Sequence, residues 1–278
     1  MKARRFWILF VFCALLLVSC SPGGMPAHPL EVYFLDVGQG DSALIRTRDG
    51  DILIDAGPES SQEMLCFRLE ELGVTSLRLL ILTHPDEDHI GGADAVVRQF
   101  DPQQVWTNGV REEDNDSYLA LQAALSERGM TETAVSYGSK CLIGEVSLTV
   151  LSPYGAVMDG NEGSLILRIQ FGEISMLFSG DAEVEAEEDL CARFGKDMLS
   201  CDLYKVGHHG SYTSTSQVFL QMMSPKYAVI SSGRGNSYGH PHGEILVRLE
   251  EAGCEILRTD ELGEIGFYSD GSTLERMQ

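Results

Sequence analysis

A metal-ligand pattern follows an apolar run at residues 79–92, LLILTHPDEDHIGG. The apolar part is typical of a buried strand, and the polar part is a short loop that can turn several side chains toward one point. Imidazole nitrogen and carboxylate oxygen are the ligands of zinc, manganese and iron. A solvated acidic loop is the alternative interpretation, but such a loop does not need both of its histidines beside carboxylates at the end of a core strand. The segment therefore predicts a metal site with four candidate ligands: His84, Asp86, Asp88 and His89.

Six of the seven histidines fall in three loops that each follow a predicted strand: His84 and His89, His208 and His209, His240 and His242. Asp181 also follows a predicted strand and a glycine, and from there its carboxylate can reach inward and bridge two cations. Two divalent ions at such a site activate a water between them and stabilise the leaving oxygen. This is the chemistry of hydrolysis at a carbonyl or phosphorus centre.

The hydrophobic periodicity predicts the elements that position these loops. Residues 30–37, 42–46 and 51–55 are short strands separated by glycine-containing turns, which is typical of an antiparallel meander. A helix at residues 62–72 and a strand at residues 76–82 then complete a βαβ unit. Its histidine loop lies at the carboxyl end of its strand, where open sheets usually place their chemistry.

The same order of strand, polar loop and helix repeats in the rest of the chain. Further helices are predicted at residues 93–100, 116–128, 184–194 and 216–223, and further strands at residues 146–151, 164–171, 173–178, 202–206 and 227–231. Helices on the outer faces of mixed sheets bury so many strands economically. The sequence therefore predicts an α/β fold, a four-layer αβ/βα sandwich, in one domain over residues 30–278.

Six motifs in the chain resemble a known family. They are FLDVGQGDS, LIDAG, HPDEDHIGG, SGDAE, KVGHHGS and YGHP, in this order from residue 34 to residue 241. The set resembles the metallo-β-lactamase superfamily, and within it the hydrolase domain of ComEC-type DNA-uptake proteins. The resemblance covers nearly all of the chain from residue 30 onward. It implies a metallo-β-lactamase fold and a metal-dependent hydrolase with two divalent metal ions.

The resemblance also implies roles for the candidate ligands. His84, Asp86, Asp88 and His89 match the superfamily's H-x-H-x-D-H motif, and Asp181 matches the bridging carboxylate. The departure is Asp86, where the superfamily usually has a second histidine. Because a carboxylate in place of an imidazole makes the site harder, manganese is as plausible as zinc. We expect Asp88 to be essential for hydrolysis and dispensable for the core.

The last metal ligand has three candidates, His208, His209 and His240, and one sequence does not order them. We favour His208 as the ligand, with His209 and His240 as a second-site ligand or as the general acid that protonates the leaving oxygen. His242 falls on the first turn of a predicted helix and is expected at the surface. Asp55 ends a strand beside the histidine loop, so we expect it to hydrogen-bond a ligand imidazole.

Three further residues are candidates for binding substrate. Asn161 stands where many relatives carry another histidine ligand. Its amide either binds a metal weakly or orients water or substrate; the alternative is a turn residue that caps the start of a strand. Lys205 is one of the few basic residues near the motifs and can contact a phosphate. Ser211 opens a Ser/Thr-containing run that can hydrogen-bond a phosphate, although such runs more often mark the start of a helix.

The N-terminus is typical of a bacterial lipoprotein. Residues 1–20 contain basic residues, an apolar run too short for a comfortable membrane span, and the sequence LVSC, which resembles a lipobox ending at Cys20. An ordinary secretory signal or an uncleaved anchor is the alternative interpretation. Residues 21–29 are predicted to be a flexible tether. The domain is therefore expected on the outer face of the cytoplasmic membrane, anchored by a lipid on Cys20.

The charge balance limits the possible substrates. The formal net charge is −22 at pH 7, so the protein cannot hold nucleic acid by a broad basic surface. The first hypothesis is a nuclease or phosphodiesterase that holds DNA or another phosphodiester through metal ions and a few local donors. The alternatives are a hydrolase of a lactone, a β-lactam or another ester, or a surface-binding protein without turnover.

The cysteines of the predicted domain show no C-x-x-C spacing, which excludes a zinc ribbon or a redox pair of that kind. Their apolar surroundings suit buried thiols, and an oxidising compartment also permits one disulfide. These residues are Cys66, Cys141, Cys191, Cys201 and Cys254.

Overall fold

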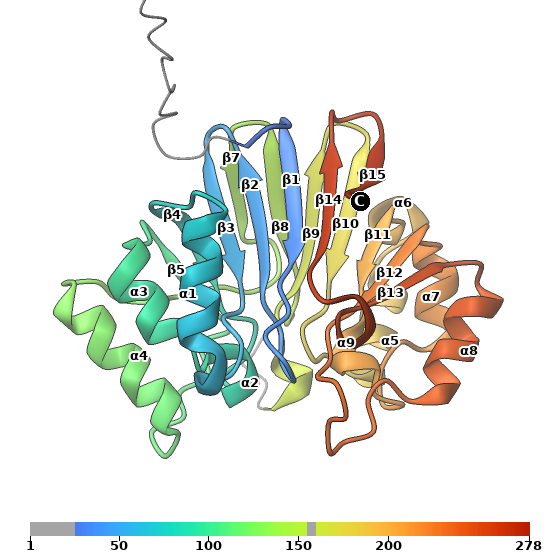
Figure 1. Ribbon diagram of the computed structural model, residues 1–278. Coiled ribbons are helices and arrows are strands. Elements are labelled where there is room, and N and C mark those ends of the chain that lie inside the picture. Colours follow the sequence, from blue (N-terminus) through green and yellow to red (C-terminus); the bar gives the residue numbers. More distant parts are fainter. Residues whose placement is uncertain (1–25, 155–159) are drawn as a thin grey trace, which may run out of the picture.

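The computed structural model describes residues 26–154 and 160–278, where two β-sheets pack face to face with helices on their outer sides (Figure 1). The predicted four-layer sandwich is confirmed. The predicted export signal and Cys20 lie outside the described residues. No helix within the two described ranges has the length and apolar character needed to cross a membrane.

The first sheet contains both ends of the described domain. Its strands, in spatial order, are β15 (Leu274–Arg276), β14 (Ile265–Ser269), β1 (Leu30–Phe34), β2 (Ala43–Thr47), β3 (Gly50–Ile54), β4 (Leu77–Ile81), β5 (Val105–Thr107) and β6 (Thr133–Ala134). The predicted antiparallel meander is confirmed as β1–β2–β3. The predicted βαβ unit is confirmed as well, because β3 and β4 pair in parallel.

The second sheet is built from the C-terminal half. Its spatial order is β13 (Glu255–Arg258), β12 (Tyr227–Ile230), β11 (Leu203–Lys205), β10 (Ile174–Phe178), β9 (Ile166–Phe171), β8 (Val146–Ser152) and β7 (Lys140–Ile143). Strands β10 to β13 are parallel, so their carboxyl ends meet at one edge of the sheet. Consecutive functional loops are therefore brought side by side.

The helices cover the outer faces. Helices α1 (Gln62–Glu71), α3 (Ala93–Phe100) and α4 (Asp116–Glu127) pack on the first sheet, and α5 (Val184–Arg193), α7 (Gln217–Met223) and α8 (Gly243–Glu251) pack on the second. Short helices occupy the connections. They are α2 (Glu87–Ile90), α6 (Lys196–Leu199), α9 (Thr259–Leu262) and the 3₁₀ turns η1 (Glu59–Ser61), η2 (Asn161–Gly163) and η3 (Gly207–Gly210).

Strand β3 illustrates why the sheets are apolar on both faces. Ile52 and Ile54 point into the core between the two sheets, whereas Leu53 packs against the helices. Successive strand residues face opposite sides, and both sides are covered here, so the strand is a continuous apolar run. The described residues thus form three apolar layers, one between the sheets and one under each set of helices.

The remaining parts of the domain add three findings. Residues 26–29 of the predicted tether lie against the domain, since the His28 ring stacks on Tyr268 at 4.1 Å. The predicted strand 30–37 ends at Phe34, because Leu35 leaves the ladder and bonds to Ser42 across a turn. The five cysteines of the described residues are free thiols: Cys66, Cys141, Cys191, Cys201 and Cys254.

Candidate metal centre

His89 lies at the centre of a buried polar cluster. Its Nδ1 lies 2.9 Å from Oδ2 of Asp55, and its Nε2 lies 3.1 Å from Oδ1 of Asp181. Asp55 is itself fixed, because its two oxygens accept hydrogen bonds from the backbone N–H and the hydroxyl of Thr83, at 2.8 and 2.9 Å. Asp55 therefore contacts an imidazole of the histidine loop, as the sequence predicts.

His84 lies beside His89, with the two ring centroids 4.1 Å apart. Its Nδ1 is 3.1 Å from the Thr83 hydroxyl, and its Nε2 is 3.6 Å from Oδ2 of Asp86. Asp86 precedes helix α2 and its side chain is 44% exposed, so this carboxylate is the least constrained part of the histidine loop.

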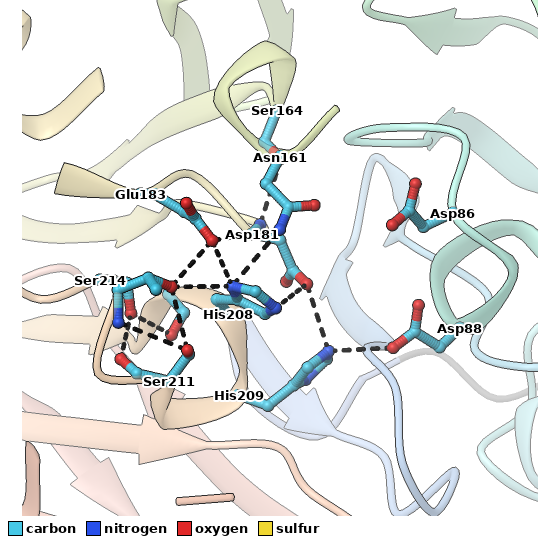
Figure 2. Close-up of polar contacts among 12 residues, drawn as sticks. Asp86, Asp88, Asn161, Ser164, Asp181, Glu183, His208, His209, Ser211 and Ser214 are labelled. Carbon is cyan, nitrogen blue, oxygen red and sulfur yellow. Dashed lines mark hydrogen bonds and ion pairs between the residues drawn. The ribbon is translucent and has the colours of Figure 1, made fainter. Parts of the chain in front are cut away.

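His209 reaches the same centre from the second sheet. Its Nε2 lies 3.2 Å from Oδ2 of Asp88 and 3.5 Å from Oδ2 of Asp181. On the other side of the ring, Nδ1 lies 3.0 Å from the Ser231 carbonyl and 3.2 Å from Oδ1 of Asp41. In Figure 2, Asp181 lies between His208 and His209, and Asp86 and Asp88 approach from the opposite side.

The turn η3 orients the histidine pair. His208 and His209 both have left-handed backbones, with φ of 47° and 53°, so the two rings leave the turn in different directions. Gly210 follows with φ of 81°, and a Cβ there would lie 2.6 Å from the Pro241 ring. Gly210 is thus required by a tight turn packed against Pro241.

The donor set fits divalent metal ions. Groups of three ligand atoms within 4.8 Å of one another include His84, His89 and Asp181 in one group, and Asp88, His89 and His209 in another. Nε2 of His84, Nε2 of His89 and Oδ1 of Asp181 are buried and form no hydrogen bond of good geometry, although His89 Nε2 and Asp181 Oδ1 lie 3.1 Å apart. Buried polar atoms without a partner are costly, and cations bound between these atoms would satisfy them.

The electrostatics of the cluster also favour bound cations. Burial alone would lower the pKa of His89, but Asp181 and Asp55 raise it well above its ordinary value. For His209, burial again acts downward, whereas Asp181 and Asp41 raise the pKa to about 10. The pKa of Asp181 is well below its ordinary value, because His209 and His89 outweigh the effect of burial. The same field that attracts protons to the imidazoles attracts a divalent ion.

His208 occupies a different position, at the open side of the cluster. Its Nδ1 lies 3.0 Å from Oε1 of Glu183, 3.3 Å from the Thr213 hydroxyl and 3.4 Å from the Asn161 amide (Figure 2). Its Nε2 points toward Asp181 at 3.7 Å. The side chain is 22% exposed, and among the described residues it does not join the close ligand groups that contain His209.

Two residues predicted to bind substrate have other partners. Lys205 is buried, with its ammonium 2.7 Å from Oδ2 of Asp41 and 3.0 Å from the Val206 carbonyl, so it lies beneath the centre and does not face a substrate. The expectation for Lys205 is corrected, because an inward strand position hides the side chain. Ser211 is also buried, and its hydroxyl bonds to Thr213 in the turn after η3.

His240 and Asn161 do lie near the centre. The His240 ring lies 5.5 Å from the His208 ring and 6.1 Å from the His209 ring. Burial, then His209 and His208, lower the pKa of His240 to about 4, so this ring is neutral at physiological pH. Asn161, in η2, donates to Oε1 of Glu183 at 3.3 Å. It therefore supports the His208–Glu183 pair.

The sequence reasoning missed Asp41 and Glu183. Asp41, in the FLDVGQGDS motif, joins Lys205 to His209 beneath the centre. Burial would raise the pKa of Asp41, but Lys205 and His209 lower it below its ordinary range. Glu183 follows Asp181 by two residues in the SGDAE motif, and this proximity was the available signal.

Comparison with known families decides the assignment. Residues 35–234 match the Metallo-beta-lactamase superfamily. The chain belongs to this superfamily. The fold and the clustered ligands agree with that membership, and together they indicate a metal-dependent hydrolase that binds divalent ions.

Relatives within the superfamily include competence proteins. ComE operon protein 3 from Bacillus subtilis is 35% identical over 257 residues, which cover 85% of this chain and 33% of that protein. Competence protein ComA from Neisseria gonorrhoeae is 32% identical over 252 residues, which cover 90% of this chain and 34% of that protein. The predicted resemblance is confirmed, and the chain spans about a third of the length of these relatives.

A solved structure supports the fold independently. CmlA, a diiron beta-hydroxylase from Streptomyces venezuelae, aligns with a TM-score of 0.57 and 16% identity, covering 91% of this chain and 55% of that chain. At such low identity the likeness concerns the fold alone. The chemistry of this chain has to be argued from its own residues.

Proposed function

We propose that this protein is a metal-dependent phosphodiesterase that cleaves nucleic acid outside the cytoplasm. The observation that carries the proposal is the convergence of buried ligand atoms from His84, His89 and Asp181, which lack well-formed hydrogen bonds, at the edge where both sheets present their loops. The similarity to two competence proteins favours a phosphodiester substrate.

We assign the ligands from the distances. His84, Asp86 and Asp181 would hold one ion, and Asp88, His89 and His209 would hold a second together with Asp181. His209 replaces His208 as the preferred ligand, because only His209 lies within ligand distance of both Asp88 and Asp181. The exposed carboxylate of Asp86 makes the first position harder than a three-histidine site, so manganese and zinc are both candidates.

The two ions would supply an activated water and the positive charge that stabilises the transition state. The protein residues then have separate tasks. Asp55 and Asp41 hold the rings of His89 and His209 with Nε2 toward the centre. Glu183 accepts a hydrogen bond from Nδ1 of His208 and so directs Nε2 toward the centre, and when the ring is protonated on both nitrogens Nε2 can pass its proton to the leaving oxygen.

Export as a lipoprotein is the second part of the proposal. The lipobox-like LVSC sequence places Cys20 at the expected processing site, before the described domain. The Cys20→Ser variant should leave the membrane fraction and lose labelling by a radioactive fatty acid. A Cys20→Ser protein that stays in the membrane fraction would contradict lipid anchoring and favour an uncleaved anchor.

The test of activity uses metal-stripped, purified full-length protein reloaded with zinc, manganese or magnesium. Hydrolysis of bis(p-nitrophenyl) phosphate and of DNA should require added metal and should be lost in Asp88→Asn, whose side chain keeps its size and loses its charge. Two bound ions without phosphodiester cleavage would favour a lactone, β-lactam or other ester. Absence of bound metal would favour a binding protein without turnover.

A further inference from the structure

A groove opens beside the candidate metal centre. It encloses about 560 Å³, within the range of typical ligand sites. Its lining includes the candidate ligands Asp86 and Asp88 together with Gln39, Asn115 and Tyr238. A substrate that binds in this groove can therefore contact both the candidate ligands and Tyr238.

Tyr238 is unusual for an aromatic residue because it is 65% exposed. One face of its ring stacks on His240, with centroids 5.6 Å apart and planes inclined by 22°. His240 in turn lies 5.5 Å from His208. A short series of rings therefore leads from the groove to the His208–Glu183 pair.

The backbone around Tyr238 is held by the side chain of Asn236. Its Oδ1 accepts the N–H groups of Tyr238 and His240, at 3.1 and 3.0 Å, and its amide donates to the carbonyls of Gly233 and His240. Gly233 packs tightly against Gln39, which also lines the groove, and its N–H donates to Oε1 of Gln39. The loop thus fixes the position of Tyr238, although the phenol ring contributes little to the core. A preorganised exposed ring is suited to binding.

The charge of the groove restricts how a nucleic acid could be held there. Among the described residues that line it, none is basic, and three are acidic: Asp86, Glu87 and Asp88. Affinity from many phosphate contacts is therefore excluded at this surface. Stacking of bases on aromatic rings supplies affinity without basic residues and without sequence preference. It requires bases whose faces are accessible, as in a single strand.

We propose that Tyr238 is a stacking platform for a nucleobase next to the scissile phosphate, which makes single-stranded nucleic acid the preferred substrate class. This inference rests on the proposed phosphodiesterase function. In it the metal centre binds the phosphate, the Tyr238 ring binds a neighbouring base, and His240 supports the ring from behind. Duplex DNA, whose base faces are covered, lacks this interaction.

The test compares the full-length wild type with Tyr238→Ala and Tyr238→Phe, on a single-stranded oligonucleotide, on an abasic oligonucleotide of the same length and on the corresponding duplex. Tyr238→Ala should lower kcat/KM for the normal oligonucleotide about tenfold, chiefly through KM, and the penalty should disappear with the abasic strand. Tyr238→Phe should retain wild-type values, since the ring is kept. Phe67→Ala, which removes an aromatic ring of 59% exposure from helix α1, is the matched control and should have no effect.

The outcomes separate this inference from the proposed function. Cleavage of both strands by the wild type with an unchanged Tyr238→Ala variant, or equal cleavage of duplex DNA, would overturn the stacking proposal and leave the phosphodiesterase intact. If neither strand is cleaved, the phosphodiesterase proposal fails. Fluorescence anisotropy then decides about stacking: single-strand binding that weakens in Tyr238→Ala supports it, and equal or absent binding overturns it.

Discussion

The buried and open halves of the candidate metal centre contain the same residue type in different surroundings. In the buried half, His84, His89 and His209 are at most 1% exposed, and carboxylates surround the latter two rings. In the open half, His208 and His240 contact each other and solvent. The pKa of His209 is raised to about 10, whereas that of His240 is lowered to about 4. The carboxylates around His89 and His209 therefore favour bound cations in the buried half, whereas burial and the neighbouring imidazoles keep the His240 ring neutral in the open half.

The largest effect on both halves is expected from removal of the Asp181 carboxylate, which contacts histidines of each half. Asp181→Asn keeps the size of the side chain but removes the charge shared by His89, His208 and His209. We expect loss of at least one bound ion and a fall in kcat of about a thousandfold, since metal ions contribute several kcal/mol to transition-state stabilisation. Metal analysis and phosphodiester hydrolysis measure this. Full metal content with wild-type turnover would contradict the assignment.

The ion pair between Lys205 and Asp41, beneath the buried half, can be removed without changing a candidate ligand. Lys205→Met leaves the carboxylate of Asp41 buried without its ammonium partner, which lies 2.7 Å away in the wild type. The free energy of unfolding should fall by about 3 kcal/mol, as for other broken buried ion pairs. The double variant Asp41→Asn/Lys205→Met should recover part of this loss in urea unfolding of the metal-free protein. A double variant less stable than Lys205→Met would show that Asp41 has a stronger structural partner.

Glu187 is a buried carboxylate outside the metal centre, and its pKa can be compared with those of the carboxylates within the centre. Glu187, on α5, accepts the N–H groups of Thr215 and Ser216, and burial raises its pKa from 4.5 to about 7. The folded protein thus binds this proton more tightly than the unfolded chain. The resulting stability is fully present below pH 4.5 and is lost as the pH rises toward 7, by a few kcal/mol. Because the other titrating groups are common to both proteins, the stability of the metal-free wild type relative to Glu187→Gln should fall by this amount across the range, and parallel unfolding curves would contradict it.

Substitution of the carboxylate beside His89 and of the carboxylate beside His208 should have different effects on metal affinity. Asp55→Asn disturbs His89 and should weaken metal affinity about 10- to 100-fold, as is usual for a residue that orients a ligand. Glu183→Gln disturbs His208 and should leave metal affinity unchanged while lowering kcat. Competitive titration with a chelating dye measures the affinities. Equal weakening in both variants would place His208 among the metal ligands.

The smallest effect is expected at His242. Its Nδ1 accepts the N–H of Tyr212 at the rim, and the ring faces neither Asp88 nor Asp181 at ligand distance among the described residues. His242→Ala should change kcat/KM for a phosphodiester by less than about threefold, in line with a rim substitution. A larger loss in steady-state kinetics would extend the catalytic surface beyond His240.

Much of this arrangement was predictable from local sequence patterns. The strands β1 to β3, the limits of α3 and the grouping of candidate ligands in the histidine loop all follow from neighbouring residues. The order of preference between His208 and His209 was not predictable, because the directions of the two rings depend on the left-handed backbones of both residues in η3. Lys205 was misjudged because its partner Asp41 lies in the β1–β2 connection of the other sheet, and only the fold brings them together.

The pairing of β14 with β1 was equally invisible in the sequence, since the two strands come from opposite ends of the domain. It has a consequence for how the domain is made. β1 has β2 on one side, but its other edge stays unpaired until Ile265–Ser269 is available, so the first sheet cannot close while the chain is still incomplete. Contacts between distant segments slow folding. The domain is thus expected to fold late and slowly, with an open β-edge that can pair wrongly with other chains in the meantime.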